Sequence, residues 1–188
     1  MFADSLKLFA HEEERTNLPP LYNAEDVENA MKLWHEIPYH QITELHGGFQ
    51  IFPKDAGHIL GSAMYEITYN GTKIVFTGDL GNSPTPLLSD TEDITDATYM
   101  IMESVYGDRN HETKEDRIGK LEDVIEDNFK KGGALVIPSF SLEKTQVLLY
   151  EINKLVEEGR VPSMPVFLDS PLAIKITNVY KEFKKDFK

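Results

Sequence analysis

Apolar positions in the first 48 residues recur with a helical period on an otherwise polar background. The Pro-Pro pair at 19–20 is expected to end a first helix, because proline removes a backbone donor and clashes with the preceding turn. A second helix is predicted to start at Asn23 or Ala24 and to end before Pro38. We expect its apolar stripe to pack in a core. The stripe consists of Val27, Ala30, Met31 and Trp34.

Short apolar runs between residues 49 and 103 replace the helical period and predict strands. Asn70-Gly71 is expected to form a tight hairpin, because both residues tolerate the positive φ that such a turn needs. The strand that ends this region finishes in an acid, Glu103. The predicted strands are Phe49–Phe52, Ser62–Tyr69, Lys73–Phe76 and Thr98–Glu103.

Helical stripes return after residue 110. Thr113 with Asp116 is typical of a helix start, and Gly132-Gly133 of a helix end. Ser141 is expected to cap the next helix, which stops at Gly159. A third helix is predicted to start at Ser170-Pro171. Two buried strands are expected between these helices, and the alternation indicates a parallel sheet covered by helices. They are Ala134–Ile137 and Val166–Leu168.

Composition narrows the class of protein. The chain has 188 residues and no cysteine, so any metal must be held by imidazole and carboxylate groups. No apolar run is long enough to span a bilayer, and we expect a soluble, cytoplasmic protein without membrane contact. The net charge is −13, with 5 Lys/Arg against 17 Asp/Glu in residues 1–103 and 14 against 15 in residues 104–188. The second half is therefore the better candidate to face a polyanion.

Three acidic or imidazole side chains stand beside glycine or at strand ends: His58, Asp79 and Glu103. Glycine lets the chain turn and lets a metal or phosphate approach closely. Taken singly, each residue has a plainer interpretation. His58 could be structural, Asp79 could form a turn with its own backbone, and Glu103 could be a solvated edge residue. Their joint presence and order favour a shared site.

Together these segments resemble the β-CASP branch of the metallo-β-lactamase superfamily, which includes ribonuclease J-type enzymes and the nuclease subunits of the cleavage-and-polyadenylation machinery. The resemblance rests on Gly57-His58-Ile59-Leu60-Gly61-Ser62-Ala63, Thr77-Gly78-Asp79-Leu80-Gly81 and Glu103-Ser104-Val105-Tyr106-Gly107-Asp108-Arg109, then on Ile137-Pro138-Ser139-Phe140-Ser141 and Leu168-Asp169-Ser170-Pro171-Leu172-Ala173. It implies an α/β fold, with a partial metallo-β-lactamase core of αββα type over residues 1–104. The start of a parallel α/β β-CASP domain would follow over residues 105–188.

The resemblance also implies a chemistry. Two Zn²⁺ ions would activate a water for attack on a phosphodiester bond of RNA, or of DNA. His58 matches a ligand of one ion, and Asp79 matches the carboxylate that bridges both. Glu103 matches an acid that orients a later histidine, and we assign Glu103 and Asp79 the catalytic roles. Ser139, Ser141 and Lys144 match a region that binds nucleic-acid backbone, although Ser141 could simply cap its helix.

The main metal motif of the family, His-x-His-x-Asp-His, is not found among the six histidines of this sequence. We therefore expect weak zinc binding, no turnover by this chain alone, and a metal site completed by further N- and C-terminal polypeptide. An unpaired sheet edge could also lead to a homo-oligomer. One alternative is a non-catalytic fragment or scaffold that binds nucleic acid or protein. Another is a metallo-hydrolase of small esters, which residues 105–188 disfavour.

Overall fold

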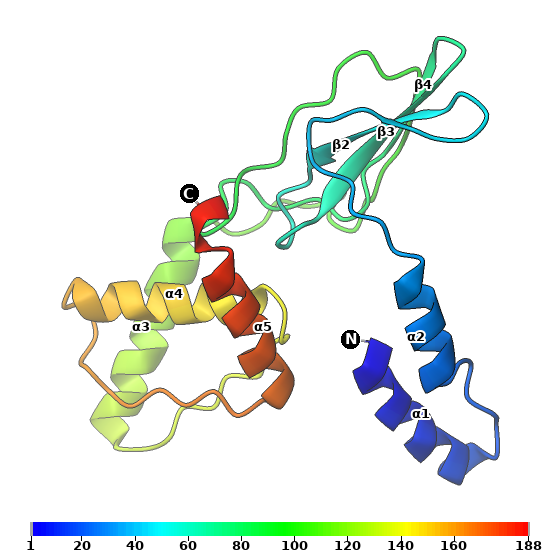
Figure 1. The fold of residues 1–188 in the computed structure, drawn as a ribbon. Coiled ribbons are helices and arrows are strands. Elements are labelled where there is room, and N and C mark those ends of the chain that lie inside the picture. The colour runs from blue at the N-terminus through cyan, green and yellow to red at the C-terminus, as the bar shows by residue number, and fades with distance from the viewer. Residues whose placement is uncertain (1, 188) are drawn as a thin grey trace. The chain divides into compact units, whose positions relative to one another are not determined.

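The computed structural model describes residues 2–187, without the side chains at 3, 4 and 186. The chain divides into two compact units, Met1–Pro38 and Tyr39–Lys188, which are described separately. The first unit is helical, and the second combines a sheet with helices (Figure 1). The predicted α/β class is confirmed. No helix among the described residues is both long enough and apolar enough to cross a membrane.

The first unit consists of α1 (Phe2–Thr16) and α2 (Ala24–Lys32). α2 starts at Ala24, as predicted, and Asn23 caps it. The Asn23 side chain accepts from the Glu25 and Asp26 amides, while the Asp26 carboxylate accepts from the Asn23 amide. This reciprocal arrangement satisfies amide groups that a helix start leaves unpaired.

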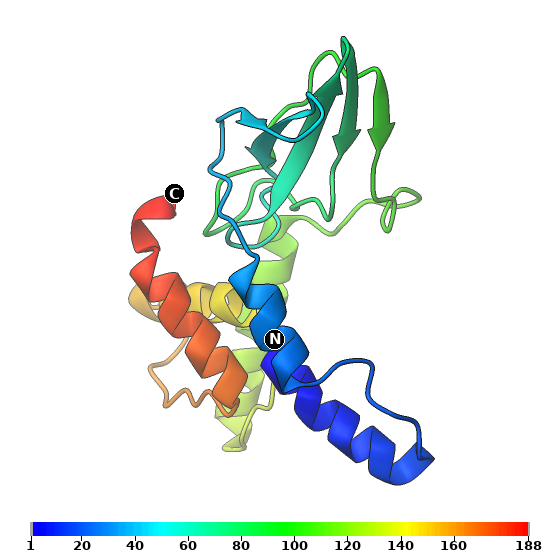
Figure 2. The same ribbon diagram turned by 45° about the vertical axis from the view of Figure 1, so that its right-hand side comes forward.

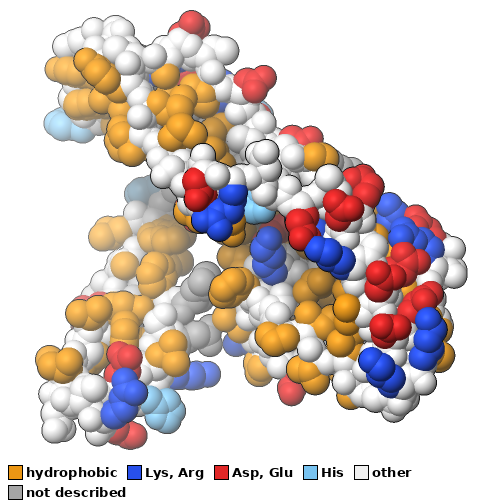
Figure 3. Space-filling model, turned by 180° about the vertical axis from the view of Figure 1, so that it is seen from behind, with side chains coloured by type: hydrophobic (Ala, Val, Ile, Leu, Met, Phe, Trp, Pro, Cys, Tyr) orange, Lys and Arg blue, Asp and Glu red, His pale blue; other side chains and the backbone are white. Residues whose placement is uncertain are grey.

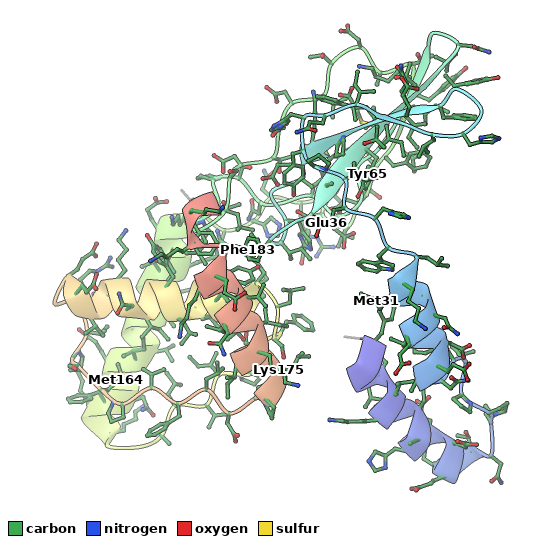
Figure 4. All side chains as sticks on the ribbon, in the orientation of Figure 1. Met31, Glu36, Tyr65, Met164, Lys175 and Phe183 are labelled. Atoms are coloured by element: carbon green, nitrogen blue, oxygen red, sulfur yellow. The ribbon has the colours of Figure 1, made fainter. Side chains whose placement is uncertain are left out.

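The expectation that the apolar stripe of α2 packs in a core is wrong. Trp34 is 65% exposed, and Met31, labelled in Figure 4, is 48% exposed. No residue of α2 is buried. The ring contact within this unit runs instead through Tyr22, whose ring lies 4.9 Å from that of Phe9. Helical period identifies a stripe, but a core also needs a second apolar surface to cover it.

The second unit contains a five-stranded mixed sheet in chain order. Three neighbouring pairs are antiparallel, and β4 and β5 are parallel, with Val75 opposite Met100. Figure 2 shows the strands side by side with β5 at one edge. Asn70 and Gly71 both have positive φ, which confirms the predicted hairpin. The strands are β1 (Thr43–Glu44), β2 (Gln50–Asp55), β3 (Ala63–Tyr69), β4 (Thr72–Phe76) and β5 (Tyr99–Ile101).

Three helices follow the sheet: α3 (Lys114–Lys131), α4 (Lys144–Glu157) and α5 (Pro171–Glu182), and a short 3₁₀ turn, η1 (Lys184–Asp186), closes the series. α3 and α5 start where predicted, with the Thr113 and Ser170 side chains as caps. Gly132 ends α3 with positive φ, as predicted. Ile125, Leu155 and Val161 form a buried cluster that holds α3 and α4 together.

The prediction of two strands between these helices is wrong. Residues 134–137 and 166–168 have no regular secondary structure. Val136 is 81% exposed and Phe167 is 86% exposed. A run of apolar residues becomes a buried strand only when another strand supplies hydrogen bonds and a layer covers it. The described residues supply no such partner to either segment.

Candidate metal site and its family

Two loops of the sheet meet at an unusually close backbone approach. The first loop follows β2 and contains Gly57 and His58, and the second follows β4 and contains Asp79 and Gly81. The Gly81 amide donates to the Ala56 carbonyl at 2.8 Å. A Cβ atom placed on Gly81 would lie 1.9 Å from the Gly57 carbonyl oxygen. Glycine at 81 is therefore what allows the two loops to touch.

The His58 loop is held by its own polar side chains. The Asp55 carboxylate accepts from the Gly57 amide at 2.8 Å, and the Ser62 hydroxyl accepts from the His58 amide at 3.0 Å and the Ile59 amide at 3.2 Å. The Tyr39 hydroxyl donates to the Ser62 carbonyl at 2.6 Å. These bonds fix the backbone on both sides of the imidazole.

His58 and Asp79 face each other across the loop contact. Their Nε2 and Oδ2 atoms are 3.9 Å apart, and the two side chains are 42% and 79% exposed. This distance is too long for a hydrogen bond. Two zinc ligands, each about 2.1 Å from a shared ion, can be up to about 4.2 Å apart. The pair therefore fits one ion. Among residues 2–187, the Asp79 carboxylate accepts no hydrogen bond, which disfavours its interpretation as a turn-former.

Glu103 holds the second loop in place. Its Oε1 accepts from the Leu80 amide at 3.0 Å and its Oε2 accepts from the Val105 amide at 3.2 Å. The Glu103 amide donates to the Thr77 hydroxyl at 3.3 Å. Leu80 follows Asp79 directly, so the Glu103 carboxylate ties the Asp79 turn to the end of β5. A solvated edge residue would not make these contacts.

Ser139, Ser141 and Lys144 lie around the start of α4. Ser139 and Lys144 are exposed, and the Ser141 hydroxyl lies 3.5 Å from that of Ser170. Ser141 does not cap α4, contrary to expectation, because Glu143 takes that position and its side chain makes no cap bond. The Thr145 and Gln146 side chains reach back to the Phe140 and Ser141 carbonyls instead.

Glu143 and Tyr180 join this region to the His58 loop, and the sequence patterns did not identify them. The Tyr180 hydroxyl donates to the Glu143 carboxylate and accepts from the Leu60 amide at 3.3 Å. Burial raises the pKa of Glu143, although the Tyr180 hydrogen bond and the charge of His58 act in the opposite direction. In the sequence, Tyr180 is one more apolar ring in a helical pattern, and nothing local marks its hydroxyl as a link to a residue 120 positions away.

Imidazole and carboxylate are the donors that zinc sites use, so the chemistry of His58 and Asp79 fits the implied ions. The described part of the chain contains no group of three or more His, Cys, Asp or Glu side chains arranged to hold a metal ion. His58 and Asp79 thus provide two donors of a site for which zinc requires at least three.

Comparison with known proteins identifies the family. Residues 4–105 match the metallo-beta-lactamase superfamily domain, and residues 145–188 match the Beta-Casp domain. A ribonuclease of Thermus thermophilus is 30% identical over 89% of this chain and 38% of its own length. An RNase J-like protein of Methanocaldococcus jannaschii is 32% identical over 89% of this chain and 40% of its own length.

A eukaryotic relative shows the same pattern. The endoribonuclease YSH1 of Kluyveromyces lactis is 31% identical over 87% of this chain and 22% of its own length. The chain thus spans at most about two fifths of these curated relatives. The first family match covers more than half of the chain and contains all three side chains of the candidate site. The chain therefore belongs to the metallo-β-lactamase superfamily, and the Beta-Casp match at residues 145–188 agrees with its β-CASP branch.

Proposed function

We propose that this chain contributes to metal-dependent hydrolysis of phosphodiester bonds in RNA, with His58 and Asp79 as ligands of Zn²⁺. The distance of 3.9 Å between their donor atoms is the observation that supports it most directly. Membership in the superfamily implies metal ions at the site. Bound zinc would supply Lewis-acid stabilisation of charge on the phosphate oxygens and would activate the attacking water.

The chain's own residues would position this chemistry. Asp79 is exposed and its carboxylate is available to a cation. Glu103 would keep the Asp79 turn in register through the Leu80 amide. We extend the proposal to the domain level, with residues 1–104 in the metallo-β-lactamase part and residues 105–188 in the β-CASP part. The family matches at 4–105 and 145–188 support this division.

RNA is the proposed substrate because the relatives are named as ribonucleases. Ser139, Ser141 and Lys144 are its proposed contacts on this chain. The start of α4 is connected to the His58 loop by hydrogen bonds from Glu143 through Tyr180 to Leu60. A phosphate bound at the start of α4 would therefore lie near the proposed zinc ligands. Figure 3 shows Lys and Arg intermixed with Asp and Glu over the helices α3 to α5. The first half of the sequence, by contrast, is acidic. The cytoplasmic location and self-association stay predictions.

The test follows the imidazole resonances by NMR while Zn²⁺ is raised from micromolar to millimolar concentration. We expect the His58 signal to respond only well above micromolar zinc, because two donors bind weakly. Asp79→Asn should weaken the response by about tenfold or more. His46→Ala is the matched control, since His46 is exposed in a loop before β2 and should not affect the His58 signal.

A second arm measures binding of single-stranded RNA against salt. Lys144→Ala should lower the affinity and flatten the salt dependence by about 0.7 in the logarithmic slope. If His46 and His58 respond equally to zinc, the metal-site proposal is wrong. If zinc binds at His58 while RNA binding ignores Lys144, the substrate contacts lie elsewhere. RNA binding without any zinc response would favour the non-catalytic alternative.

A further inference from the structure

Tyr180 occupies an unusual position for a hydroxyl group. The residue lies on α5 and is only 4% exposed, yet its hydroxyl makes two polar contacts to segments distant in the sequence. One contact reaches the Leu60 amide in the loop of His58, and the other reaches the Glu143 carboxylate before α4. Figure 4 labels Phe183, one turn further along α5, at the end of the helix that approaches the sheet loops. Tyr180 therefore connects three separate segments at one atom.

Glu143 is held in a strained conformation at this junction. Its φ of 61° and ψ of −59° are rare for a residue with a side chain, and the Lys144 amide closes a tight turn onto the Leu142 carbonyl at 2.8 Å. Such strain persists only where surrounding contacts hold it, and it is common at functional sites. Here the strained turn places a half-buried carboxylate against the Tyr180 hydroxyl and near the charge of His58.

Among the amides of the His58 loop, that of Leu60 depends on a partner from outside the loop. The His58 and Ile59 amides are paired inside the loop by Ser62, whereas the Leu60 amide is paired by Tyr180. Leu60 lies two residues beyond His58. An acceptor from α5 therefore pairs an amide of the turn that carries the imidazole. Without it, the half-buried Leu60 amide would favour a different loop conformation.

We propose that Tyr180 is a positioning residue for the His58 loop, with Glu143 orienting its hydroxyl, so that α4 and α5 determine where the imidazole stands. The importance of that position for metal binding rests on the proposed function. The ordering of the loop does not, because it follows from contacts among the chain's own residues.

The test replaces the hydroxyl alone. Tyr180→Phe keeps the ring and leaves the Leu60 amide without its acceptor, so exchange of that amide with solvent should become about fivefold faster in NMR measurements. Tyr150→Phe on α4 is the matched control. Tyr150 is 40% exposed, its hydroxyl makes no hydrogen bond to a described residue, and Leu60 exchange should stay within about twofold of the parent chain.

The second readout separates positioning from general support. In Tyr180→Phe, the His58 ring resonances should shift without zinc, and millimolar zinc should bind several-fold more weakly at His58. Glu143→Gln keeps an acceptor for the Tyr180 hydroxyl and should resemble the parent chain, whereas Glu143→Ala should resemble Tyr180→Phe. If Tyr180→Phe does not fold, the two Glu143 variants decide the question by the same readouts.

Unchanged Leu60 exchange in both Tyr180→Phe and Glu143→Ala would overturn the proposal. Equal acceleration in Tyr150→Phe would overturn it too, because it would indicate general loosening of the helices. A chain in which zinc never reaches His58, while Leu60 exchange still depends on Tyr180, would disprove the proposed metal site and leave the positioning of the loop supported.

Discussion

At the level of single residues, the candidate site depends on contacts too close for most side chains. Gly81 sits against Gly57, and the Gly57 carbonyl occupies the space that a Cβ atom would need. Gly57 itself has positive φ and is enclosed by the backbone of Ser89 and Thr91. The separation of His58 and Asp79 is thus determined by which residues lack a side chain, as much as by the ligands themselves.

Gly81→Ala should therefore separate the two loops. We expect the free energy of unfolding to fall by about 2–3 kcal/mol, because the new methyl group overlaps backbone that cannot rotate away. Gly119→Ala is the control. Gly119 lies inside α3, where a methyl group would meet no atom within 4 Å, and alanine there should stabilise by about 0.5–1 kcal/mol. Urea denaturation measures both. Equal stability of Gly81→Ala and the parent chain would contradict the close approach.

At the level of elements, the helices of the second unit begin in two different ways. The α5 helix has a side-chain cap, since the Ser170 hydroxyl accepts from the Ala173 amide at 3.2 Å. The α4 helix follows the strained Glu143 turn and has no such cap. Local sequence signals describe the first start well. They fail at the second, where Glu143 is committed to Tyr180 rather than to its own helix.

Ser170→Ala should reduce the free energy of unfolding by about 1 kcal/mol, because it leaves a helix-start amide without its acceptor. Ser141→Ala should change it by less than about 0.5 kcal/mol, since Ser141 does not cap α4. Urea unfolding followed by circular dichroism compares the two variants directly. A loss at Ser141 as large as that at Ser170 would restore Ser141 as a capping residue.

At the level of the whole molecule, the sheet encloses one acidic residue between two lysines. Glu66 on β3 is 6% exposed and lies 3.1 Å from Lys54 on β2 and 2.9 Å from Lys73 on β4. Burial alone would raise the pKa of Glu66, but hydrogen bonds and charge from Lys73 and Lys54 outweigh it, so the pKa is lowered from 4.5. The ion pairs therefore link sheet stability to pH.

The pKa of Glu66 is lower in the folded chain than in the unfolded chain. Ionised Glu66 therefore stabilises the fold at pH values above its ordinary pKa, and this stabilisation is lost as the pH falls through the pKa of the folded chain. The free energy of unfolding should drop in acid below pH 4.5 more steeply in the parent chain than in Glu66→Gln. Glu157→Gln, at an exposed position of α4 without an ion pair among the described residues, should keep the parent slope. Identical slopes for Glu66→Gln and the parent chain would rule out this linkage.

Much of the local structure could be predicted from the sequence alone. The hairpin at Asn70-Gly71, the helix starts at Asn23, Thr113 and Ser170, and the stop at Gly132 all follow from hydrogen bonds or φ angles within a few residues. Family membership likewise follows from short segments in a fixed order, since they match relatives over nearly nine tenths of the chain. Such signals need no knowledge of distant contacts.

Only the tertiary structure decided which apolar positions are covered and which polar groups meet. Trp34 and the segments at 134–137 and 166–168 have the patterns of buried elements, yet burial requires a partner surface that no local pattern specifies. The 3.9 Å between His58 and Asp79 and the bond from Leu60 to Tyr180 join residues 21 and 120 positions apart. Free energy gained at such contacts depends on the whole chain reaching one arrangement, because each partner must be held in place by its own surroundings.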